Sequence, residues 1–108
     1  MTRCEIVRMP TELDRLIVSL VGDYERRASV LRRRAAAQDV LDRYHTLNRA
    51  IDEAIAEVCE PGICRQIRLD IGDRRGARRS PINCMGEGLY KKRKRDAKWS
   101  IARHLHLI

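Results

Sequence analysis

Five consecutive basic residues, at positions 91–95, have the type and spacing that most clearly indicate a chemistry in this chain. Lysine and arginine bind anions, and arginine can also contact a guanine edge with two hydrogen bonds. A helical turn with cations on every side is not expected to pack against its own protein. We therefore expect it to face water or an anionic partner, and nucleic acid is the partner typical of such a run.

The positive charge of the chain is segregated toward its C-terminal part. From residue 65 onward there are 13 Lys or Arg and 4 Asp or Glu, a net charge of +9, whereas all 108 residues together carry +8. The first 64 residues therefore sum to about −1. Four arginines lie in a loop-like segment at 73–81, and all four lysines lie in the last predicted helix. This distribution predicts a cationic surface formed by the loop and that helix.

The predicted DNA contacts differ in their roles. A helix enters the major groove when its leading turns are polar and its trailing turns are anchored in a core, as the pattern at 86–108 indicates. Lys91, Lys92 and Arg93 are expected to face base edges or the groove floor, with Arg93 as the candidate base contact. The cations expected to neutralise phosphates are Arg74, Arg75, Arg78, Arg79, Lys94, Arg95 and Lys98.

Apolar residues at steps of three and four predict the helices that must position these cations. One stripe runs through 13–35, interrupted by Gly22, and a second runs through 40–58. They form either an antiparallel hairpin turning near 37–39, which we favour, or one helix of roughly 50 residues paired with another chain.

The predicted fold is therefore all-α. Residues 1–60 form a helical hairpin or coiled coil that oligomerises. Residues 61–108 form a small basic module resembling a helix-turn-helix, with a short helix at 63–71 before the loop.

Motifs for catalysis are not found in the sequence. It has no nucleophile elbow, Gly-rich phosphate loop, HExxH or acidic metal cluster, so an enzyme is not expected. Cys4, Cys59, Cys64 and Cys84 lack the paired spacing of a zinc site, and we expect free thiols with no metal or cofactor. The chain also lacks an apolar run of about 18 residues and an apolar leader, which predicts a cytoplasmic protein without a membrane partner.

Three segments resemble the RinA and ArpU type of phage transcription regulators. These are DYERR at 23–27, LNRAIDEAI at 47–55, and the stretch 85–108 with its small-polar, Tyr, basic-run and I-A-x-x-L-x-L order. The last stretch is similar to the family's recognition helix, while 73–85 departs from it, being too rich in Arg, Gly and Pro for a full scanning helix. The resemblance implies a sigma-like helix-turn-helix that binds duplex DNA. It also implies an N-terminal region that forms a homo-oligomer or contacts RNA polymerase.

Two other classes of function remain open from the sequence. The helical hairpin could bind a protein partner while the basic end only solubilises the chain. Alternatively, the protein could bind RNA, with Tyr90, Trp99 and the arginines stacking on bases.

Overall fold

The computed structural model describes residues 8–72 and 86–108, and all of its regular elements are helical. The predicted all-α class is confirmed. Within these ranges no helix is long and apolar enough to cross a membrane. The helices are α1 (Thr11–Gly22), α2 (Tyr24–Arg33), α3 (Gln38–Val58), the single 3₁₀ turn η1 (Pro61–Ile63), α4 (Cys64–Gly72) and α5 (Glu87–His104).

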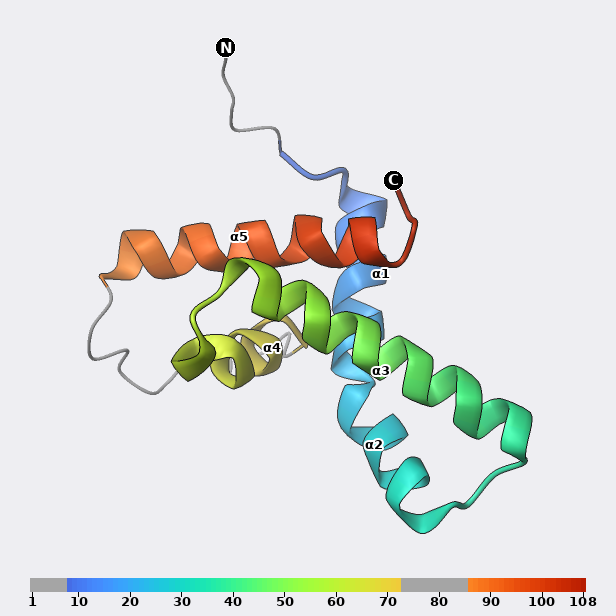
Figure 1. The fold of residues 1–108 in the computed structure, drawn as a ribbon. Coiled ribbons are helices and arrows are strands. Elements are labelled where there is room, and N and C mark those ends of the chain that lie inside the picture. The colour runs from blue at the N-terminus through green and yellow to red at the C-terminus, as the bar shows by residue number, and fades with distance from the viewer. Residues whose placement is uncertain (1–7, 73–85) are drawn as a thin grey trace.

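The N-terminal helices form a hairpin and not one continuous rod. α2 ends at Arg34, which takes a left-handed conformation with φ of 52°, and the chain turns before α3 begins at Gln38. α3 then returns alongside α2 in the opposite direction (Figure 1). The favoured hairpin is therefore confirmed, and its turn lies slightly earlier than the expected 37–39. The helix-turn-helix remains a prediction, since 73–85 lie outside the described residues.

α1 and α4 cross at two glycines whose backbones touch. A Cβ atom on Gly22 would lie 2.9 Å from the carbonyl oxygen of Gly72, and one on Gly72 would lie 2.8 Å from the Cα of Gly22. The sequence predicted a helix interruption at Gly22 and a helix end at Gly72. The structure gives a further physical reason for both glycines, because no side chain fits where the two backbones meet.

The hydrophobic core joins the two predicted regions. Ile17, Ile51, Ile67 and Ile101, which come from α1, α3, α4 and α5, are all fully buried in one cluster. α5 lies along α3, and α1 crosses behind these two helices in the view of Figure 1. α1 also contacts both α4 and α5. Much of the apolar stripe from which we expected self-association is thus covered within a single chain. A homo-oligomer stays a prediction.

A buried arginine fixes the break between α1 and α2. Arg27 is 2% exposed, and its Nε donates to the Asn48 side-chain oxygen at 2.7 Å. It also donates to the Leu20 carbonyl oxygen and forms an ion pair with Asp23. Burial lowers the pKa of Arg27, and the Asp23 carboxylate opposes that shift. A buried charge needs such partners, so this network ties the helix break to α3.

Candidate nucleic-acid interface

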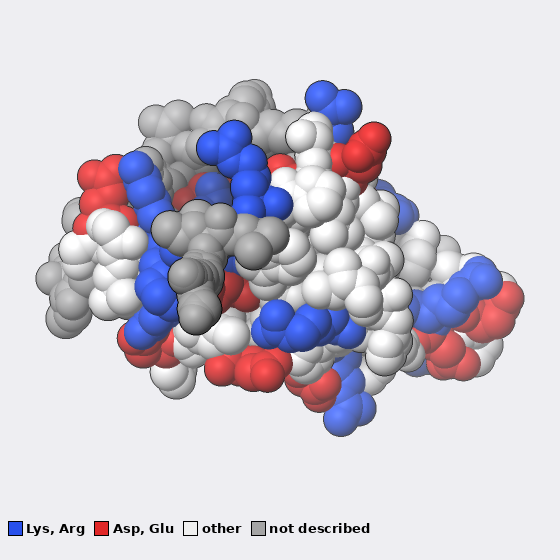
Figure 2. All heavy atoms as spheres, turned by 90° about the horizontal axis from the view of Figure 1, so that it is seen from above, with Lys and Arg blue, Asp and Glu red and all other residues white. Residues whose placement is uncertain are grey.

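α5 is anchored along most of its length. Its Ser100 hydroxyl donates to the Ala54 carbonyl oxygen at 2.8 Å, and Ala97, Ile101 and Ala102 are fully buried. The basic front of the helix is anchored too, because Tyr90 is only 2% exposed. The view onto α5 shows Lys and Arg side chains gathered over part of its outward face (Figure 2).

The expectation that the basic turn would not pack against its own protein is therefore wrong. The Tyr90 ring fills the core, and its hydroxyl donates to the buried carboxylate of Asp70 at 3.0 Å. Two basic side chains of the same turn also contact carboxylates on neighbouring elements. Tyr90 is consequently unable to stack on a base, as the RNA alternative required.

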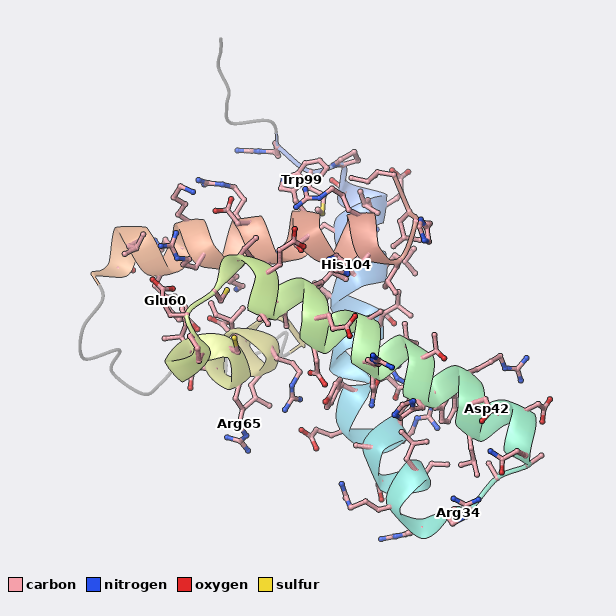
Figure 3. The ribbon with its side chains drawn as sticks, viewed as in Figure 1. Arg34, Asp42, Glu60, Arg65, Trp99 and His104 are labelled. Carbon is pink, nitrogen blue, oxygen red and sulfur yellow. The ribbon has the colours of Figure 1, made fainter. Side chains whose placement is uncertain are left out.

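Arg93 points toward an acid of its own chain. Its Nε and Nη2 donate to the two carboxylate oxygens of Glu60 at 3.0 and 3.2 Å. This hydrogen bonding lowers the pKa of Glu60 and raises the pKa of Arg93. Glu60 lies just below the first turns of α5, in the connection from α3 to α4 (Figure 3). The guanidinium fork that a guanine would need is thus occupied by a carboxylate, so this geometry does not favour Arg93 as the base contact.

Lys94 also contacts the acidic side of the fold. Its Nζ lies 3.1 Å from a carboxylate oxygen of Asp70, which is itself 4% exposed. Lys92 lies on another side of α5, where its Nζ is 2.7 Å from Asp96 one turn later. Three of the five cations at 91–95 therefore have close acidic partners within the chain.

A groove lined by cations lies between α5 and the segment that enters α1. The groove has a volume of about 530 Å³. On α5, Lys94 and Arg95 each lie three or four residues from both Lys91 and Lys98. These four side chains therefore share one face of the helix. We call this feature the α5 groove, and its lining residues are Arg8, Met9, Thr11, Asp14, Lys91, Lys94, Arg95, Lys98 and Trp99.

The charge of the α5 groove is strongly unbalanced. Among the described residues, its lining has five cations and one carboxylate, Asp14, which lies 2.8 Å from the Nζ of Lys98. Lys91 is 65% exposed, with a loose contact of 3.4 Å to Glu87. Within 8–72 and 86–108, Arg8 and Arg95 have no ion pair. The groove is therefore suited to an anionic ligand.

Trp99 contributes the aromatic surface of the groove. It is the single tryptophan of the chain, it is half-buried, and it lies outside the hydrophobic core cluster. It projects from the upper side of α5, near the segment that leads into α1 (Figure 3). The groove thus combines cations with the face or edge of an indole ring.

Sequence reasoning found some of these residues and missed others. Lys91, Lys94, Arg95 and Lys98 were predicted as DNA contacts, and the structure brings them to one groove. Arg8 and Met9 were missed, because they precede the first predicted helix, in a segment whose apolar residues alternate only weakly. The predicted phosphate contacts Arg74, Arg75, Arg78 and Arg79 lie outside the described residues.

Another polar cluster joins α3 to the end of α5. His104 Nε2 and the Ser100 hydroxyl lie 2.7 and 3.1 Å from the same oxygen of Glu57. These contacts lower the pKa of Glu57. Ser100 is fully buried and donates to a backbone carbonyl, so a substrate could not reach it as a nucleophile. This cluster fastens α5 to α3.

The thiols and acids of the described ranges do not form a metal site. Cys59 is buried and Cys64 is half-buried, and both are free thiols. Burial raises the pKa of Cys59 to about 11, which disfavours the thiolate that metals bind. Among the described residues, no group of three or more His, Cys, Asp or Glu could hold a metal ion.

The chain was compared with protein-family models, curated proteins and solved structures. No family model, no curated protein and no solved structure matches it.

Proposed function

We propose that this protein binds nucleic acid through the α5 groove, with duplex DNA as its ligand. The observation that carries the proposal is the charge of the groove. Among the described residues, four cations of the anchored helix α5 and Arg8 before α1 surround one carboxylate, Asp14. A rigid helix that presents cations on one face is the arrangement by which proteins follow a phosphate backbone.

The affinity of such a surface comes mainly from released counterions. Each phosphate that a cation neutralises contributes about −0.9 to the slope of log K against log salt on duplex DNA. Arg8, Lys91 and Arg95 are the side chains most available for this, since they are exposed. Arg95 replaces Arg93 as the candidate base contact, because its guanidinium has no acidic partner among the described residues.

The narrower role that we propose is transcription regulation of the RinA and ArpU type. It is supported by the resemblance of 85–108 to the recognition helix of that family and by the basic character of α5. In this role, a homo-oligomer would place two α5 grooves on one DNA site, and the α2–α3 hairpin would be free to contact RNA polymerase.

The test compares two triple substitutions that remove the same charge. Arg8→Ala, Lys91→Ala and Arg95→Ala together empty the groove of its exposed cations. The matched control replaces Arg32, Arg33 and Arg43, which are exposed on α2 and α3 and do not line the α5 groove. We expect the groove variant to flatten the salt slope by about 3 and the control to leave it nearly unchanged.

The measurement is fluorescence anisotropy of labelled duplex at several salt concentrations. Equal losses in the two variants would mean that overall charge and not the groove governs binding. No binding by the unsubstituted protein would favour the protein-interaction alternative. Stronger competition by structured RNA than by duplex DNA would favour the RNA-binding alternative.

A further inference from the structure

The hydrophobic core does not cover the Trp99 side chain fully, so the indole is available to an external ligand. A tryptophan is usually largely buried in a core or placed at an interface. Trp99 is half-buried, lies outside the core cluster and faces a groove lined by cations. In the described residues, cation–π contacts form at Tyr24 and Tyr44 and none forms at Trp99. The indole is therefore not covered by a guanidinium of that part of the chain.

The dimensions and chemistry of the groove indicate a ligand with both a negative charge and a flat ring. Its volume of about 530 Å³ is in the range of small-molecule sites, roughly 300–1,000 Å³. Arg8, Lys91 and Arg95 supply the charges for a phosphate, and Met9 adds an apolar contact beside the indole. A nucleotide carries these two features on one unit, phosphate and base.

A nucleotide base can stack on the Trp99 indole only when the base is unpaired. In a duplex, each base presents only its edges, since both faces are covered by neighbouring bases. In a single strand, the faces are accessible and stack on aromatic side chains with little sequence preference.

We propose that the α5 groove binds one unpaired nucleotide, with its base stacked on Trp99 and its phosphates on Arg8, Lys91 and Arg95. This rests on the proposed binding of nucleic acid through the same groove. It adds that the preferred DNA is a duplex with an adjoining single-stranded segment. The duplex lies against the cations of α5, and the first unpaired nucleotide enters the groove.

The test uses three labelled DNA ligands with the full chain. They are a blunt duplex, the same duplex with a short single-stranded overhang, and that duplex with an abasic overhang. The abasic overhang has the same phosphates without the bases, so it isolates stacking from charge. We expect the overhang with bases to bind at least about fivefold more tightly than the abasic one, the lower end for one stacked base.

Substitution of Trp99 tests whether this difference comes from stacking. Trp99→Leu should abolish the preference for the overhang with bases, so that the variant binds this overhang and the abasic overhang with equal affinity. Trp99→Phe, which keeps a smaller ring, should retain part of the preference. An unchanged circular dichroism spectrum would show that both variants fold.

Intrinsic fluorescence provides an independent readout, because Trp99 is the single tryptophan of the chain. The overhang with bases should quench its emission, and the abasic overhang should not. Equal affinities for the two overhangs, or a preference that survives in Trp99→Leu, would overturn the stacking proposal while leaving duplex binding intact. Failure of all three ligands to bind would overturn the proposed function as well.

Discussion

The two sides of α5 carry the same kinds of residue but use them differently. On the inner side, Arg93 contacts Glu60 and Tyr90 enters the core, and Lys94, which also lines the groove, contacts Asp70. On the groove side, Lys91 and Arg95 line the α5 groove, where Asp14 is the single carboxylate among the described lining residues. Arg93 and Lys94 fasten the helix to the α3–α4 connection and to α4, whereas Lys91 and Arg95 are available to an external anion.

This difference shows that a run of cations does not have one role. Successive residues of a helix are rotated by about 100°, so five consecutive positions point around the whole circumference. The side chain that points toward Glu60 stabilises the fold, and the side chains that point toward solvent form the candidate interface. Substitutions on the inner side should therefore change stability, and those on the groove side should change binding.

The largest expected effect on stability comes from a substitution on the buried side of α5. Ile101→Ala should lower the free energy of unfolding by about 2–5 kcal/mol, because Ile101 is fully buried and its removal leaves a cavity. Trp99→Leu, two residues earlier on the groove side, should cost about 1 kcal/mol or less. Urea denaturation of both variants measures the difference. A larger loss of unfolding free energy for Trp99→Leu than for Ile101→Ala would place Trp99 in the core. It would contradict the proposed difference between the two sides of α5.

A smaller effect is expected where α1 crosses α4. Gly22→Ala should destabilise the protein by about 1–3 kcal/mol, since the new methyl group would lie 2.9 Å from the Gly72 carbonyl oxygen. Gly88→Ala is the matched control on α5, because within 4 Å of its Cβ position there is no atom of a described residue apart from its chain neighbours and the backbone of its own helix. There the gain in helix propensity should stabilise the protein by up to about 1 kcal/mol. Stabilisation by both substitutions would mean that the crossing is looser than described.

The smallest effect concerns the pH dependence of the inner ion pair. Arg93 lowers the pKa of Glu60 below its ordinary 4.5, so the folded state holds the Glu60 proton less tightly than the unfolded state. The pair should contribute its full stability above pH 4.5 and lose it as the pH falls through the lowered pKa. Urea midpoints of Glu60→Gln and the unsubstituted protein should differ at neutral pH and converge in acid. A difference that persists in acid would assign the effect to packing.

The helices could be predicted from the sequence because their signals are local. The apolar spacing in 13–35 and 40–58 gave the hairpin helices, and Pro61 with Gly62 marked the end of α3. The turn at Arg34 was less clear, because it uses a left-handed arginine and has no glycine or proline.

The site was harder to predict because it depends on how α5 is rotated in the fold. Every position of 91–95 is cationic, so residue type alone does not indicate which cation contacts Glu60. The RNA alternative required Tyr90 to be accessible to a base, yet its side chain is buried and its hydroxyl donates to Asp70 of α4. Arg8 reaches the groove only through tertiary packing of the segment before α1, which local periodicity cannot report.

The most direct test of this division compares Arg93→Ala with Arg95→Ala, two substitutions that remove one charge each from the same run. We predict that Arg95→Ala weakens duplex binding and flattens the salt slope by about 1, with the urea midpoint unchanged. We predict that Arg93→Ala lowers the urea midpoint and leaves the salt slope nearly unchanged. Equal flattening of the slope by both substitutions, or a larger one from Arg93→Ala, would contradict the account.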